Sequence, residues 1–149
     1  MNWTKDRSIL LSQVCTALFA LLLGALDVGC YWAVHWFIHL RNMNWQKGIA
    51  FMVTIYLCSV FAWLLLFNLW RLLGNMKGGR VFVEENVRHL RTVSWCCVGA
   101  AIICFVSCAY YLPFLFISIA AAFMALIVRI VKNVFQQANA MKSELDFTV

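Results

Sequence analysis

Four long apolar stretches, separated by short polar ones, make up most of the chain. They cover approximately residues 9–38, 48–73, 93–111 and 113–134. Each stretch is continuous rather than alternating, and a segment in lipid must satisfy its backbone hydrogen bonds internally, so each predicts a membrane-spanning helix. The pattern as a whole predicts an all-α integral membrane protein. We expect a four-helix bundle made of two helical hairpins in a single domain, 1–149.

Composition and cysteine content agree with a chain that lies in lipid. Of the 149 residues, 64% are hydrophobic and the mean hydropathy is +0.84. A soluble core of this size cannot bury that much apolar surface. All seven cysteines lie inside the apolar stretches, and an odd number spread in this way does not indicate a disulfide framework. We therefore expect them to pack as small hydrophobic side chains.

The distribution of Lys and Arg predicts the orientation of the chain. Ten of the twelve lie near the two termini or in the polar stretch between the second and third helices and its flank. The other two, Arg41 and Lys47, lie in the first loop. Because cytoplasmic loops are enriched in Lys and Arg, we expect both termini and the segment 74–92 to be cytoplasmic. The net charge of +6 then reflects topology, and no motif indicates direct nucleic-acid binding.

The cytoplasmic connecting segment 74–92 has a predictable local structure. Its glycines allow the second helix to end in a turn. A helical pattern begins at Glu84, with Val87 and Leu90 on its apolar face. The pattern predicts a short amphipathic helix on the cytoplasmic membrane surface that leads directly into the third membrane helix. The tail, 135–149, is polar and of mixed charge.

Two stretches contain recognisable motifs: Lys77-Gly78-Gly79-Arg80-Val81-Phe82-Val83-Glu84-Glu85-Asn86-Val87-Arg88-His89-Leu90-Arg91, and the tail from Phe135 to Val149. The first resembles the signature of a bacterial membrane protein family, domain of unknown function 2975. In that signature a Lys-Gly element leads to a Phe, then to Thr or Ser before Glu-Glu-Asn, then to a basic-x-Leu-Arg step. The tail resembles the family's ending, in which Phe-x-x-Ala precedes an acidic stretch closing on Leu-Thr-Val. This chain differs at Val83, where the family has Thr or Ser, and at Phe147, where it has Leu.

The resemblance implies a four-helix protein of the bacterial cytoplasmic (inner) membrane, with unknown activity. Members of this family are often encoded beside a small helix-turn-helix regulator of the Cro/cI type. The resemblance therefore implies a cytoplasmic protein partner, by family association only.

Asp27 is the one acidic residue inside an apolar stretch. Ionisable residues within membrane helices are costly and are candidates for function. If the first helix enters the membrane at Ile9, Asp27 lies about 27 Å along it, near the outer boundary of the lipid. Two interpretations stay open: a hydrogen-bonded structural residue, or a proton-coupled or ligand-binding site in which Tyr31 is a polar partner.

His35 and His39 follow Asp27 and Tyr31 at four-residue spacing, on the same helix face. Histidines at i and i+4 can bind a metal ion, but such a site needs a third ligand, for example Asp27. The alternative is a pair of histidines at the membrane interface. We expect neither a metal ion nor another cofactor.

No catalytic arrangement is visible in the sequence, so we do not expect an enzyme. The leading hypothesis is a non-enzymatic sensing, regulatory or interaction component. The alternative is a small transporter or channel that uses Asp27. Small residues spaced four apart, such as Ala25, Gly29 and Ala33, allow close helix approach within the bundle or between protomers, so a homo-oligomer stays open. In the leading hypothesis the lipid bilayer and a cytoplasmic protein are the partners, and the candidate interaction residues are Lys77, Arg80, Phe82, Glu84, Glu85, Asn86, Arg88 and Arg91.

Overall fold

The computed structural model describes residues 3–148, and all of its regular structure is helical. Its helices are α1 (Trp3–Arg41), α2 (Trp45–Lys77), α3 (Glu84–Ser107) and α4 (Phe114–Phe147). Each of them is long and apolar enough to cross a membrane. The prediction of an all-α, four-helix membrane protein is confirmed, and the chain is a multi-pass membrane protein.

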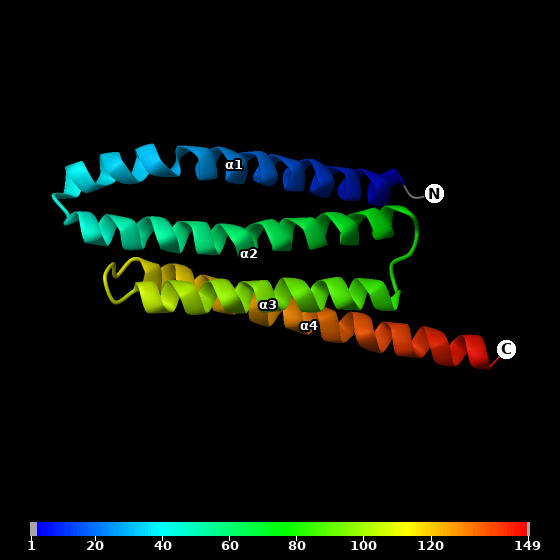
Figure 1. Cartoon of the computed structure of the whole chain (residues 1–149). Helices are drawn as coiled ribbons and strands as arrows, with labels where there is room; N and C mark the ends of the chain where they lie inside the picture. Colours follow the sequence, from blue (N-terminus) through cyan, green and yellow to red (C-terminus); the bar gives the residue numbers. More distant parts are fainter. Residues whose placement is uncertain (1–2, 149) are drawn as a thin grey trace.

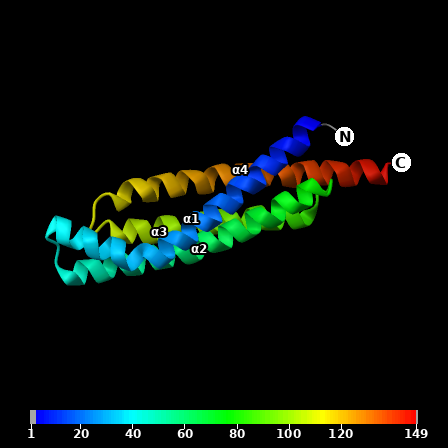
Figure 2. The ribbon, with the colours of Figure 1, turned by 90° about the horizontal axis from the view of Figure 1, so that it is seen from above.

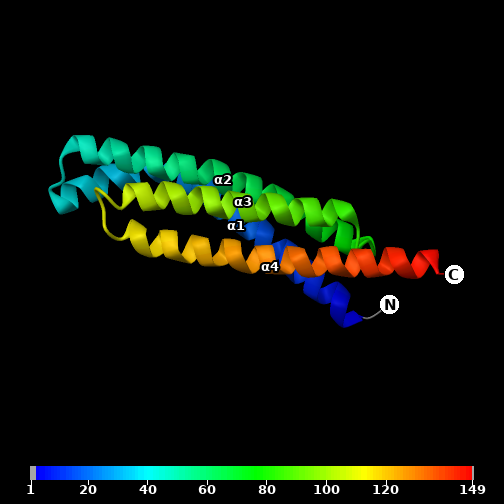
Figure 3. The ribbon, with the colours of Figure 1, turned by 90° about the horizontal axis from the view of Figure 1, so that it is seen from below.

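The helices are arranged in chain order, so that each packs mainly on its neighbour in the sequence (Figure 1). The N-terminal part of α1 runs at a clear angle to α2 (Figures 2 and 3). Buried side chains are concentrated on α3, whereas α1 is largely exposed. The interior of the molecule therefore lies around α3, and the large exposed apolar surface of the other helices is suited to lipid.

Small residues bring α3 close to both of its neighbours. Facing α2, a Cβ atom on Gly99 would lie 2.7 Å from Cε1 of Phe61, so only glycine fits against that ring without movement. Facing α4, the hydroxyl of Ser94 donates to the carbonyl of Ala125 at 3.2 Å. The hydroxyl of Ser118 donates in the other direction, to the carbonyl of Ala101 at 2.8 Å. Bonds of this kind are how helices associate in lipid, where no hydrophobic effect holds them together.

At one end of the molecule, aromatic rings bring α1, α2 and the turn before α4 together. Phe51 of α2 packs against Phe37, Tyr111 and Phe114, with ring centroids 5.5, 5.7 and 5.2 Å away. Aromatic pairs at such distances are favourable beyond their buried area. This end also contains the short turn between α1 and α2 (Figure 1).

The opposite end contains both described ends of the chain and the connection between α2 and α3 (Figure 1). We call it the basic end, because most Lys and Arg residues lie at it or close to it in the sequence. α2 stops at Lys77, where the Gly78 amide bonds to the Gly74 carbonyl and Gly79 takes a φ of +77°. Only glycine adopts that backbone angle without strain, as the turn requires.

Most of the helix ends lie beyond the predicted apolar stretches, most clearly at the start of α3 and at the end of α4. The amphipathic stretch that begins at Glu84 forms the first turns of α3, which is one continuous helix, rather than a separate surface helix. The polar tail is helical as far as Phe147, so α4 extends beyond the other helices (Figure 1). Both stretches lack proline, and the tail also lacks glycine and is rich in helix-forming residues, so nothing in their sequence stops the helix.

Candidate functional site

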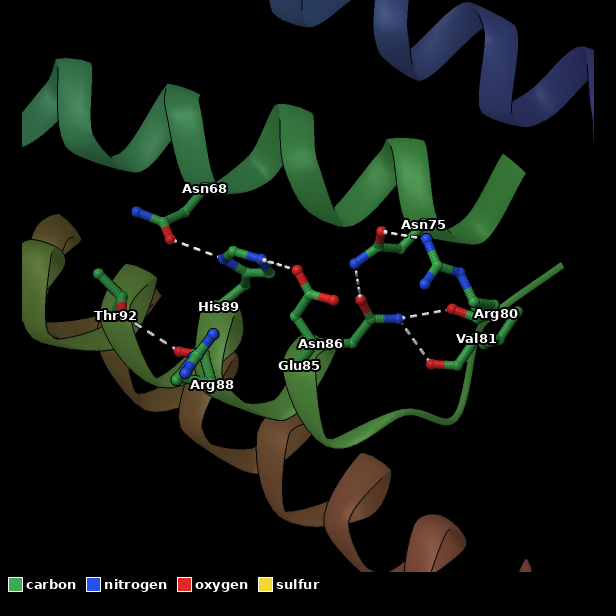
Figure 4. A network of polar contacts seen from close by, with 9 residues as sticks. All are labelled: Asn68, Asn75, Arg80, Val81, Glu85, Asn86, Arg88, His89 and Thr92. Atoms are coloured by element: carbon green, nitrogen blue, oxygen red, sulfur yellow. Dashed lines mark hydrogen bonds and ion pairs between the residues drawn. The ribbon is translucent and has the colours of Figure 1, made fainter. Parts of the chain in front are cut away.

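Asn86 is the centre of a buried polar network at the basic end (Figure 4). Its relative exposure is 0%, although it belongs to the first turn of α3. Its Nδ2 donates to the carbonyls of Arg80 and Val81, at 2.9 and 2.8 Å. Its Oδ1 accepts from Nδ2 of Asn75 on α2, at 2.9 Å. One amide side chain therefore joins the end of α2, the connecting loop and the start of α3.

Further bonds hold the 78–83 connection to α2. The Arg80 amide donates to the Asn75 carbonyl at 3.0 Å, and the Arg80 guanidinium reaches Oδ1 of Asn75 at 3.5 Å. The ring of Phe82 packs against that of Phe135 on α4, with centroids 5.7 Å apart. Because the buried polar groups are paired, the connection has one defined geometry relative to three helices.

His89 lies one turn further along α3 and is also buried. Nδ2 of Asn68, on α2, donates to the Leu64 carbonyl, so Oδ1 of Asn68 accepts from Nδ1 of His89 at 2.8 Å. Nε2 of His89 lies 3.5 Å from Oε1 of Glu85 and has no closer polar partner among the described residues. Figure 4 shows the resulting chain from Asn68 through His89 to Glu85. Polar contacts between α2 and α3 thus continue one turn into the apolar part of the molecule.

A groove runs between the start of α3 and the end of α4. Its two adjoining hollows have volumes of about 650 and 460 Å³. They share Glu84, Asn139 and Ser143, so they form one continuous surface, which we call the α3–α4 groove. Its remaining lining residues are Phe82, Val83, Glu85, Val87, Arg88 and Arg91 before and along α3, with Gln136, Ala140, Lys142, Asp146 and Phe147 of α4.

The predicted interaction residues do not all share one role. Five of them line the α3–α4 groove, whereas Asn86 is buried in the network. Lys77, at the end of α2, and Arg80, on the connection, are exposed and do not line the groove. The sequence prediction missed the α4 side of the groove, although polar residues at 136, 139 and 143 have the spacing of one helix face. It also missed Asn68. This polar residue interrupts an apolar stretch, which could have indicated that its side chain needs a buried hydrogen-bond partner.

Asp27 forms hydrogen bonds with side chains of α2. The Ser59 hydroxyl lies 2.6 and 2.8 Å from the two carboxylate oxygens, and Nε1 of Trp63 donates to Oδ2 at 2.9 Å. The hydroxyl of Tyr56 donates to the backbone carbonyl of Asp27 at 3.2 Å. Both carboxylate oxygens therefore have donors from α2, which supports the structural interpretation of this residue.

The depth of Asp27 in the membrane stays a prediction. Its partner Ser59 lies in the middle of the apolar part of α2, 48–70. The prediction measured depth from Ile9. However, α1 has 39 residues, and a helix of that length extends well beyond about 30 Å of hydrocarbon. The length of α1 alone therefore does not fix where it enters the lipid.

The histidine face of α1 does not join Asp27. Tyr31 stacks on His35, with centroids 6.2 Å apart, and His35 packs against the rings of His39 and Trp45. The described residues contain no group of three or more His, Cys, Asp or Glu side chains that could hold a metal ion. In this arrangement Tyr31 and both histidines form an exposed aromatic row towards the end opposite the basic end.

Comparison with known proteins places the chain in a family. Residues 31–149 match the family described as Protein of unknown function (DUF2975). No curated protein and no solved structure is detectably similar to the chain. The match includes the Asn86 network and the whole α3–α4 groove, whereas Asp27 precedes it. Since the match covers most of the sequence, and as the two motifs predict, the chain belongs to the DUF2975 family.

Proposed function

We propose that this protein is a non-enzymatic interaction component of the membrane, which binds a cytoplasmic protein in the α3–α4 groove and so senses or relays a signal. The observation that supports the proposal is the groove itself, a large hollow lined by both polar and apolar side chains at the end of a very apolar molecule. The Asn86 network holds the α3 side of the groove in one position relative to α2 and α4. A preorganised surface loses less entropy when a partner binds.

The charges in the groove suggest how a partner is recognised. Glu84 of α3 and Arg88 one turn further on both face it, and neither has an ion-pair partner within residues 3–148. Amide and hydroxyl side chains on α4 complete the lining. Unpaired charges of both signs favour a partner segment with a complementary pattern, and they set specificity and association rate more than affinity. By family association, a small helix-turn-helix regulator is the first partner to test.

The proposal requires the basic end to be cytoplasmic. The excess of Lys and Arg at that end supports this orientation. The family resemblance supports a bacterial inner membrane. The transporter hypothesis gains no comparable support, because the carboxylate of Asp27 is engaged by Ser59 and Trp63 and the nearby hollow between α1 and α2 is lined by apolar side chains.

A matched pair of photo-cross-linking positions tests the proposal. Gln136 lines the groove, whereas its neighbour Gln137 is exposed on another face of α4. With a benzoylphenylalanine residue at each position in turn, irradiation of native membranes is expected to join a soluble protein to position 136 only. Arg88→Glu should remove that cross-link. Equal cross-linking from both positions contradicts the proposal. The absence of a cross-link from position 136 when the helix-turn-helix regulator is co-expressed also contradicts it.

A further inference from the structure

A separate hollow lies between α3 and α4, further from the basic end than the groove. It has a volume of about 240 Å³ and is lined by Arg91, Ser94, Trp95, Val98, Arg129 and Lys132. Half of these side chains are cationic, and no acidic residue is among them. We call it the cationic pocket. It differs in this respect from the groove, where acidic and basic side chains are mixed.

The three cations of the pocket have no counter-charge in the described part of the chain. The side chains of Arg91, Arg129 and Lys132 form no ion pair, hydrogen bond or ring contact with other described residues. Like charges brought together by two packed helices repel one another, and the repulsion grows where lipid excludes water. An anion in the pocket would relieve this repulsion.

The distance of the pocket from the far ends of α3 and α4 agrees with the level of lipid headgroups if those helix ends lie at the lipid boundary. Arg91 lies 16 residues from the far end of α3, and Arg129 lies 15 residues from the far end of α4. These separations correspond to about 24 and 22 Å along a helix. Since the hydrocarbon layer is about 30 Å thick, a guanidinium group at this depth reaches the headgroups at the basic end when its side chain extends towards that end.

The pocket also changes in polarity along the direction of the membrane normal. Trp95 is one turn deeper than Arg91, and its side chain is 64% exposed. Val98 is almost one turn deeper again. A phospholipid has the same order: a charged phosphate, a glycerol at the interface where Trp is favoured, and then acyl chain. The Ser94 hydroxyl bonds to Ala125 and fixes the spacing of the two helices at this point.

We propose that the cationic pocket binds the phosphate group of an anionic phospholipid. Arg91 and Arg129 donate hydrogen bonds to the phosphate oxygens, Lys132 adds charge, and Trp95 packs on the glycerol. This inference is independent of the partner proposed for the groove. Arg91 lines both hollows, whereas Arg129 and Lys132 line only the pocket, so the latter two residues separate the proposals.

The test uses the full chain in a neutral detergent and three soluble probes: dioctanoyl phosphatidylglycerol, dioctanoyl phosphatidylcholine and inorganic phosphate. Binding is measured by calorimetry, and lipid retention by native mass spectrometry. The double variant Arg129→Gln/Lys132→Gln is compared with the control Arg71→Gln/Lys77→Gln, which removes the same charge from α2. The charge-retaining variant Arg129→Lys/Lys132→Arg serves as a rescue.

We expect saturable binding of phosphatidylglycerol to the wild-type protein, at least tenfold tighter than that of either other probe. The Gln double variant should lose at least tenfold in affinity, while the control and the charge-retaining variant stay within about threefold. Inorganic phosphate binding as tightly as phosphatidylglycerol overturns the lipid assignment. An equal loss in the control variant, or no preference for phosphatidylglycerol, overturns the pocket as a site. Circular dichroism of each variant checks that it is folded, so that a loss of affinity is measured only on folded protein.

Discussion

At the scale of single residues, buried amides define the geometry of the basic end. Asn86 and Asn68 each bond to a backbone carbonyl and to a side chain of another segment. A buried polar group without a partner costs several kcal/mol in apolar surroundings, so each amide disfavours arrangements that break its bonds. The asparagine of the Glu84-Glu85-Asn86 element in this chain therefore has a clear structural role.

The isosteric substitution Asn86→Asp tests this role. It keeps the shape of the side chain, but an oxygen replaces the NH2 group that donates to the carbonyls of Arg80 and Val81. We expect the free energy of unfolding to fall by at least about 2 kcal/mol, because two buried acceptors lose their donor and face a carboxylate. Chemical unfolding in detergent micelles measures the change. Asn133→Asp, at an exposed site on α4, should change it by less than about 0.5 kcal/mol. An equal effect of both substitutions would show that Asn86 does not fix the connection.

Asp27 and Ser59 form a part-buried polar contact that joins α1 to α2. Ser59→Ala removes a donor to both carboxylate oxygens, and we expect a loss of about 1 kcal/mol, typical of hydrogen bonds between membrane helices. In an Asp27→Leu background the same substitution should have almost no effect, because the acceptor is gone. Unfolding of the four variants as a double-mutant cycle gives the coupling energy. A coupling energy near zero would contradict the structural role of this pair.

At the scale of helices, local signals predicted where α2 ends and where the α3 helical pattern begins, but not how far α3 and α4 extend. The glycines after Lys77 and the acidic residues at 84 and 85 mark helix ends by local chemistry. The groove that α3 and α4 form depends on packing between helices, which the sequence pattern does not give. Likewise, the sequence alone could not identify His89 as the hydrogen-bond partner of Asn68, or Asn86 as that of Asn75. Each pair joins α2 to α3 across the connection.

The contact between α2 and α3 predicts the effect of added volume at Gly99. A leucine there meets the ring of Phe61, which lies 2.7 Å from the ideal Cβ position, and we expect a loss of about 1–3 kcal/mol through overpacking. Gly29→Leu is the matched control, since nothing lies within 4 Å of its Cβ position, and it should be neutral or slightly stabilising. Thermal unfolding in detergent compares the two variants. If Phe61→Ala restores part of the stability that Gly99→Leu loses, the ring is the cause of the loss. A Gly99→Leu protein with unchanged stability would disprove the close packing.

At the scale of the whole molecule, the row of helices leaves α1 at its edge. Hydrogen bonds from α2 to Asp27 hold the middle of α1. At the end opposite the basic end, the rings around Phe51 hold it. The family match begins at residue 31, so the N-terminal part of α1 lies outside it. Hydrophobic pattern alone predicted the number and type of helices. It did not predict their order in space, because four similarly apolar helices can pack in lipid in several ways.

The separation of charge between the two ends predicts a topology that can be tested without a ligand. Lys47 and Lys77 lie at opposite ends of α2, so single cysteines at these positions should react with an impermeant maleimide from opposite sides of the membrane. In intact cells we expect Lys47→Cys to be labelled and Lys77→Cys and Lys142→Cys to be labelled only after permeabilisation, because the Lys- and Arg-rich end should face the cytoplasm. The wild-type protein is the control, since its own cysteines lie within the apolar stretches. Labelling of positions 47 and 77 from the same side would contradict the fold. Labelling of 77 and 142 from outside would reverse the orientation and remove the basis for a cytoplasmic partner.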